Sequence, residues 1–143
     1  MTDQALNATT LFEAAGGRAG VSAIVETFYR SVEADPEIRA VYPEDLGPGK
    51  EKLKLFFEQW LGGQSVYSDR FGHPRLRRRH FPFVIAEKQA GLWLRYMRQA
   101  VQANGVPAAT EAVIFERLGP LAQHMVNAHE DVPREPLGEA FLE

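Results

Sequence analysis

The chain has 143 residues, a length at which one compact domain buries enough apolar surface to enclose a cofactor. Lys and Arg number 16 against 19 for Asp and Glu, and the net charge of -3 gives no general electrostatic reason to bind nucleic acid. The absence of cysteine excludes disulfides, iron–sulfur clusters and any cofactor held through a thiol. The sequence shows neither a signal pattern nor a membrane-length apolar run, so we expect a cytoplasmic protein without membrane association.

Apolar residues recur at steps of three and four in several windows, whereas alternating strand-like runs are nearly absent. This pattern predicts an all-α fold in a single domain over residues 10–130, between a flexible tail at 1–9 and a polar tail at 131–143. The helices expected in chain order cover residues 11–15, 19–34, 50–61, 86–104 and 110–128, with a short helical turn that carries Ile38 and Val41.

Glycine and proline set the expected boundaries. Gly16-Gly17 and Gly62-Gly63 end helices, because glycine accepts the left-handed conformation of a helix terminus. Tyr42-Pro43 closes the short turn, since the residue before a proline avoids helical geometry. We expect irregular connections over residues 44–50 and 62–74, the second long enough to suggest a functional role. Pro120 is expected to bend the last helix.

Histidine is the first candidate for a metal ligand. The four histidines have no i, i+4 pair of the kind that holds zinc on a helix. His80 stands apart because it follows the basic cluster, Arg75 to Arg79, and precedes the apolar Phe81-Pro82-Phe83. A basic rim beside an apolar wall suits haem, whose apolar ring carries two carboxylates at one edge. The alternatives are a solvated arginine cluster or a patch for an acidic partner.

Several separated motifs resemble, in the right order, the second group of truncated haemoglobins in the globin superfamily. They span roughly residues 10 to 128 and comprise Phe28-Tyr29-Arg30, Val41-Tyr42-Pro43-Glu44-Asp45, both glycine pairs, Gly72-His73-Pro74-Arg75-Leu76-Arg77, Arg79-His80, Pro82-Phe83 and Trp93. Trp93 separates the chain from the first group, and the glycine pairs separate it from the third. The resemblance implies a two-over-two helical sandwich around one haem b, iron protoporphyrin IX.

The resemblance also implies roles for single residues. His80 matches the proximal iron ligand, and the distal hydrogen-bond donors to a bound gas match Tyr29, Tyr42 and Trp93. Gly49 and Leu53 match distal positions at the start of the next helix, where Gly49 leaves the usual gate position without a bulky side chain. Positions that match haem contacts are Lys52, Tyr67 and Arg79 for the propionates, and Phe28, Phe56, Phe83 and Met97 for the ring. Ordinary core packing is the plain alternative for each aromatic residue.

The function implied is binding of dioxygen and other diatomic gases at a pentacoordinate iron, for oxygen and nitric oxide redox chemistry or for sensing. Nitric oxide, carbon monoxide and peroxide are the other expected ligands. Two distal donors, each contributing about 1.5–3 kcal/mol, argue against a carrier that unloads quickly. The alternatives are a haem peroxidase or nitric oxide dioxygenase, which needs a reductase, and a haem-free helical domain that uses the basic cluster. The sequence leaves the oligomeric state open, a homodimer included.

Overall fold

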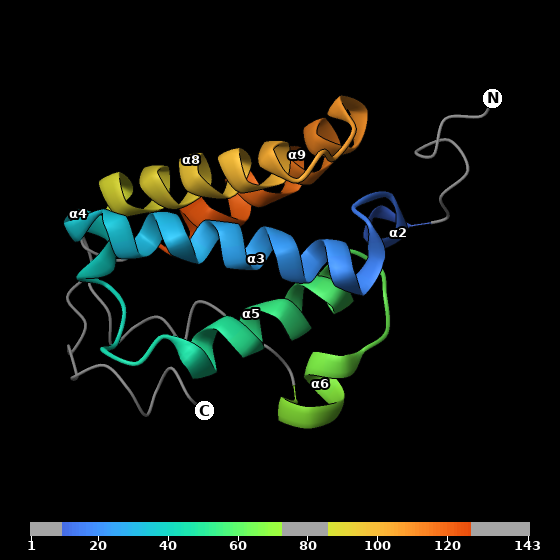
Figure 1. Ribbon diagram of the computed structural model, residues 1–143, viewed down its shortest axis with the longest axis horizontal. Coiled ribbons are helices and arrows are strands. Elements are labelled where there is room, and N and C mark those ends of the chain that lie inside the picture. The colour runs from blue at the N-terminus through green and yellow to red at the C-terminus, as the bar shows by residue number, and fades with distance from the viewer. Residues whose placement is uncertain (1–9, 73–85, 127–143) are drawn as a thin grey trace.

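The computed structural model describes residues 10–72 and 86–126, which are helical and contain no strand (Figure 1). The all-α prediction is therefore confirmed. The helices in chain order are α2 (Leu11–Ala14), α3 (Gly17–Ala34), α4 (Pro36–Arg39), α5 (Gly47–Trp60), α6 (Val66–Phe71), α8 (Glu87–Ala103) and α9 (Ala108–His124). Within the described ranges, no helix is both long and apolar enough to cross a bilayer.

The helices form two layers. In Figure 1, α8 and α9 lie together above α3, and α5 lies below it with α6 beneath the end of α5. Contacts between α3 and α8, α8 and α9, α3 and α5, and α5 and α6 connect these layers. The core side of α3 repeats at steps of three and four, as expected of an amphipathic helix, and consists of Val21, Ile24, Val25, Phe28, Tyr29 and Val32.

The first glycine pair forms the junction between α2 and α3. Gly16 and Gly17 have φ angles of +103° and +69°, in the left-handed region that favours glycine. A side chain at Gly16 would also approach the Gly20 Cα to 3.1 Å. The predicted stop is confirmed, although α3 begins two residues before the predicted start at Ala19.

The connection predicted over residues 44–50 is wrong in its second half. Helix α5 begins at Gly47, with Pro48 in its first turn, where the missing N–H costs no helical hydrogen bond. The Asp45 carboxylate accepts a hydrogen bond from the Gly47 N–H at 3.0 Å, which supports this early start. Sequence patterning missed the first turn because glycine and proline dominate it.

The long connection predicted over residues 62–74 is also wrong, because it contains α6. Gln59 of α5 binds this short helix at two points. Its side-chain oxygen accepts from the Ser68 N–H at 2.8 Å, and its amide donates to the Ser68 hydroxyl at 2.7 Å. A helix of 6 residues is too short to show a periodic pattern, and tertiary contacts of this kind stabilise it.

Two further boundaries differ from the predictions. Helix α4 ends at Arg39, so Val41 lies in the following turn. Helix α9 ends at His124, earlier than the expected end at residue 128, and contains Pro120. The bend predicted at Pro120 stays a prediction.

A partly buried ion pair connects the end of α5 to the start of α3. The Arg18 guanidinium donates two hydrogen bonds of 2.8 Å to the Glu58 carboxylate, which is buried with the residue only 3% exposed. These bonds lower the pKa of Glu58, so it stays charged at neutral pH. The close approach of the chain to Glu58 requires glycine at position 63, because a Cβ there would lie 2.7 Å from the Glu58 carbonyl oxygen. The pair thus sets the position of α5 below the core.

Candidate functional site

The predicted distal donors converge from three separate segments. Tyr29 lies on α3, Tyr42 follows α4 and Trp93 lies on α8. The ring centroids of Tyr29 and Tyr42 are 5.7 Å apart at an interplanar angle of 69°. Hydrogen bonding by Trp93 lowers the pKa of the Tyr42 phenol, so the two side chains lie within reach of each other. Phe28 packs edge-on against both Tyr29 and Trp93, with centroids 5.4 Å apart in each pair. The structure therefore brings all three predicted donors and one predicted ring contact, Phe28, into a single cluster, the distal cluster.

The Tyr29 hydroxyl lies in an unusual environment. The residue is 1% exposed, yet nothing within residues 10–72 and 86–126 forms a hydrogen bond with this hydroxyl. Leaving a buried hydroxyl without a partner costs about 1–3 kcal/mol. Burial, with a contribution from Tyr42, raises the pKa of Tyr29 well above its ordinary value. The group is thus a neutral donor at physiological pH, and an acceptor placed beside it would remove the cost.

Tyr42 and Trp93 form the other half of the distal cluster. Burial raises the pKa of the Tyr42 phenol, and the hydrogen bond from Trp93 opposes this shift without reversing it. Because an indole nitrogen can only donate, the Tyr42 oxygen is the acceptor in this bond. The Tyr42 phenol therefore stays neutral near pH 7, and its ring packs against that of Tyr29.

Helix α5 borders the distal cluster. Gly49, in the first turn, is buried, and Leu53 packs one turn later against the core. Between them, Lys50 places its ammonium 5.7 Å from the Tyr29 ring centroid and forms an ion pair of 3.1 Å with Glu26 of α3. Lys50 was not predicted from the sequence to lie near the site. Its place directly after Gly49, a predicted distal position, could have indicated this.

A second group of predicted contacts gathers where α5 meets α6. Phe56 packs edge-on against Tyr67, with centroids 5.9 Å apart, and Tyr67 lies 5.1 Å from Phe71. The Lys52 ammonium lies 4.7 Å above the Phe71 ring. The structure thus places Lys52 and Tyr67, both predicted to contact propionates, against the same Phe71 ring. Phe71 itself was not among the residues predicted to contact the haem.

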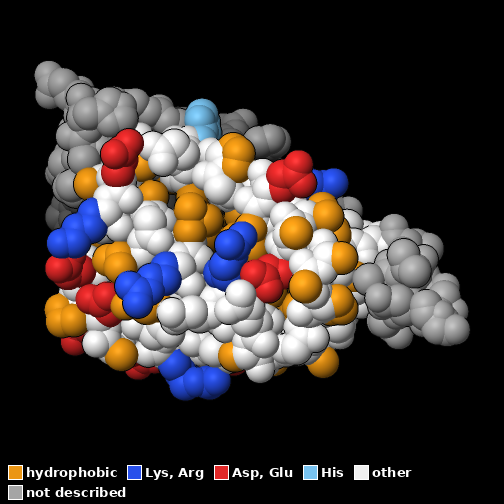
Figure 2. Space-filling model, turned by 90° about the horizontal axis from the view of Figure 1, so that it is seen from above, with side chains coloured by type: hydrophobic (Ala, Val, Ile, Leu, Met, Phe, Trp, Pro, Cys, Tyr) orange, Lys and Arg blue, Asp and Glu red, His pale blue; other side chains and the backbone are white. Residues whose placement is uncertain are grey.

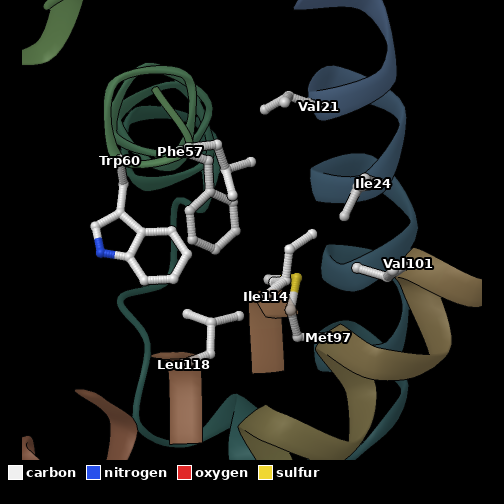
Figure 3. A pocket seen from close by; sticks show the side chains of 9 residues that line it. Val21, Ile24, Phe57, Trp60, Met97, Val101, Ile114 and Leu118 are labelled. Carbon is white, nitrogen blue, oxygen red and sulfur yellow. The ribbon is translucent and has the colours of Figure 1, made fainter. Parts of the chain in front are cut away.

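Met97 lies deeper in the core than the other predicted ring contacts. It is fully buried and borders a small apolar cavity of about 20 Å³ between the two helical layers. In Figure 3 the lining side chains converge from α3, α5, α8 and α9, and they are Val21, Ile24, Phe57, Trp60, Leu61, Met97, Val101, Ile114 and Leu118. Phe57 connects this cavity to the distal cluster, since its ring lies 6.4 Å from that of Trp93.

His80, Arg79 and Phe83 lie outside the described residues, as does the whole basic cluster. Among the residues that are described, no three His, Cys, Asp or Glu side chains gather as a metal site would require. Figure 2 shows acidic and basic side chains next to one another on the face above α8. One such pair joins α8 to α9, where Arg98 lies 3.5 Å from Glu111. The part of this face that is described therefore carries mixed charge.

Comparison with known proteins identifies the family. A family model for bacterial-like globins matches residues 10–127. The group 2 truncated hemoglobin of Bacillus subtilis is 39% identical over 110 residues, which cover 77% of this chain and 83% of that protein. The group II truncated hemoglobin of Bacillus anthracis has a similar structure, with a TM-score of 0.81 and 43% identity, covering 84% of this chain and 98% of that chain. A thermostable hemoglobin from Thermobifida fusca gives a TM-score of 0.80 and 45% identity, with 85% and 100% covered.

The match to the family model over most of the chain shows that the protein belongs to the bacterial-like globins. Its relatives place it, within that family, in the second group of truncated haemoglobins. Family membership implies a haem protein that binds a small gas.

Proposed function

We propose that the chain binds haem b through His80 and retains a diatomic gas, dioxygen above all, beneath Tyr29, Tyr42 and Trp93. The observation that carries this proposal is the buried Tyr29 hydroxyl, which has no hydrogen-bond partner in the described part of the chain and belongs to a ring that packs against Tyr42. A polar acceptor held at this point would satisfy it. A gas with partial negative charge on its outer atom is such an acceptor.

The residues around the distal cluster fit a haem in their chemistry. Phe28, Phe56 and Met97 offer buried apolar surface for the ring. Lys52 and Tyr67 lie together at the α5–α6 junction, where a cation and a phenol would bind a propionate. Haem supplies the iron to which the gas binds. The chain would supply the imidazole of His80 as ligand, the apolar walls that exclude water and the donors that hold the gas.

The state of the donors favours slow release. Burial raises the pKa of both tyrosines, so each keeps its proton and donates throughout the physiological pH range. A hydrogen bond to a charged acceptor contributes about 1.5–3 kcal/mol, and tenfold in a rate corresponds to about 1.4 kcal/mol. One relative with a TM-score of 0.79 and 38% identity is described as the truncated oxygen-avid haemoglobin of Bacillus subtilis. Long retention suits redox chemistry of oxygen and nitric oxide, or sensing, better than rapid delivery.

Reconstitution with hemin tests the proposed iron ligand. We expect the wild-type chain to take up one haem and His80→Gly to lose the spectrum of a histidine-ligated iron. Added imidazole should restore it, because the free ring would fill the space left by the side chain. His124→Gly, a matched change at the end of α9, should bind haem as the wild type does. An unaltered spectrum in His80→Gly would refute the assignment of His80. If the wild-type chain takes up no haem, the proposed function is wrong, and the alternative of a haem-free helical domain that binds a partner remains.

A further inference from the structure

Arg39, the last residue of α4, binds the turn that carries Tyr42. Its Nη1 donates to the Pro43 carbonyl oxygen at 2.9 Å and to the Tyr42 carbonyl oxygen at 3.4 Å. Its Nη2 donates to the Glu44 carbonyl oxygen at 2.8 Å. One guanidinium thus holds three consecutive carbonyl groups and ties residues 42–44 back to α4.

The arrangement constrains Tyr42 at both ends. Its main chain is held by Arg39, and its ring packs against Tyr29, with the phenol within hydrogen-bonding reach of Trp93. Pro43 has no N–H, so the turn cannot gain a backbone donor at that position. The base of Arg39 is itself fixed, because Ile38 beside it is buried in the core. The guanidinium therefore restrains the main chain from which the Tyr42 side chain extends.

We propose that Arg39 is a positioning residue for gas binding, which holds the Tyr42 phenol where it can meet Trp93, Tyr29 and the bound gas. The inference rests on the proposed function and adds a residue that does not itself contact the gas. Arginine suits the role because its planar guanidinium presents donors in a fixed fork. Lysine would keep the positive charge, but its single ammonium group could not present planar N–H donors to three carbonyl oxygens at once. Hydrogen bonds weaken steeply with angle and distance, so a loosened turn would weaken the bond that Tyr42 donates.

Oxygen dissociation, measured by stopped flow on the haem-loaded protein, tests this role. We expect Arg39→Ala to accelerate release by up to roughly tenfold, the equivalent of about 1.4 kcal/mol, and Arg39→Lys to recover part of the difference. In a Tyr42→Phe background, Arg39→Ala should change nothing further, because the hydroxyl through which it acts is gone. Arg98→Ala is the matched control, since it removes an arginine that packs on Phe115 and pairs with Glu111 of α9. It should leave release unchanged.

A second measurement reads the position of Tyr42 without any gas. In protein loaded with zinc protoporphyrin, the chain's 2 tryptophans give two indole N–H signals in nitrogen-15 NMR spectra, and Trp93→Phe identifies the one from Trp93. We expect Arg39→Ala to shift the Trp93 signal in the direction that Tyr42→Phe does, while the Trp60 signal stays in place. A merely destabilising change would not move one signal selectively. Thermal unfolding of each variant confirms that the samples are folded.

The outcomes separate this inference from the function on which it rests. If Tyr42→Phe accelerates release but Arg39→Ala does not, the proposed function stands and the role of Arg39 is wrong. The role is also wrong if Arg39→Ala has the same effect with and without the Tyr42 hydroxyl, or if the Trp93 signal does not move. If Tyr42→Phe leaves release unchanged, Tyr42 is not a donor, and both that part of the proposed function and the inference fail.

Discussion

The Tyr29 hydroxyl gives the sharpest prediction, because its removal should have opposite effects on the protein with and without a gas. Tyr29→Phe deletes one oxygen and keeps the ring, which is 1% exposed and packs against Phe28 and Tyr42. Without gas, the variant loses only a buried polar group that has no partner among the described residues. With gas, it loses the hydrogen bond that this group is proposed to donate.

Two magnitudes follow. A buried hydroxyl without a partner costs about 1–3 kcal/mol, so the haem-free variant should be at least as stable as the wild type. A hydrogen bond to a charged acceptor contributes about 1.5–3 kcal/mol, so its loss should accelerate oxygen dissociation roughly ten- to a hundredfold. Cooperation with Tyr42 and Trp93 would reduce the effect of the single change, because donors that share one acceptor are not additive.

Urea unfolding and stopped-flow oxygen release measure these two effects. Tyr96→Phe is the control for stability, because the Tyr96 hydroxyl donates a hydrogen bond of 2.6 Å to Asp35 and its removal should destabilise the protein. The reasoning would be refuted if Tyr29→Phe unfolded at lower urea than the wild type with an unchanged slope. It would equally be refuted if oxygen left both proteins at the same rate.

Three other predictions concern the surroundings of the site. Trp93→Phe should accelerate oxygen dissociation and raise the pKa of Tyr42 further, because the indole N–H that lowers this pKa is lost. An unchanged rate of oxygen release would show that Trp93 does not donate to the gas. Hydrogen bonds from Arg18 lower the pKa of Glu58 in the folded protein from its ordinary value of 4.5. The charged carboxylate therefore stabilises the fold above pH 4.5, and this stabilisation is lost as the pH falls through the lower pKa of the folded state. Glu58→Gln should therefore reduce the melting temperature at pH 7 and flatten its decline in acid, and a curve parallel to that of the wild type would contradict this. Gly63→Ala should destabilise the protein by about 1–3 kcal/mol, since its Cβ would meet the Glu58 carbonyl oxygen at 2.7 Å. Gly91→Ala is the matched change, because a Cβ at Gly91 would have no atom within 4 Å, and it should stabilise α8 by about 0.5–1 kcal/mol. If the two variants changed the free energy of unfolding in urea equally, the close approach at Gly63 would be contradicted.

The longer helices could be predicted from sequence because their core faces repeat over several turns. The residues of α3 from Val21 to Val32 show this pattern, and α8 was predicted to within one residue at each end. Helix α6 could not be predicted, because it depends on Gln59, which lies outside it. The early start of α5 was hidden by Gly47 and Pro48, whose types indicate a loop.

The candidate site divides in the same way. Tyr29, Tyr42 and Trp93 were predicted from motifs that resemble a known family, and the fold gathers them around Phe28. Arg39 carried no signal, because its acceptors are main-chain carbonyls whose positions only the fold defines. The burial of Glu58 was equally hidden, since its partner Arg18 lies 40 residues away.

The central claim is that this chain holds haem and retains oxygen beneath neutral tyrosine and tryptophan donors. The most direct test is the absorption spectrum of the hemin-reconstituted protein, recorded after reduction and again after exposure to oxygen. The account predicts a five-coordinate ferrous spectrum that converts to an oxygenated form and persists when free oxygen is removed. A protein that binds no haem, or whose ferrous spectrum does not respond to oxygen, would contradict it.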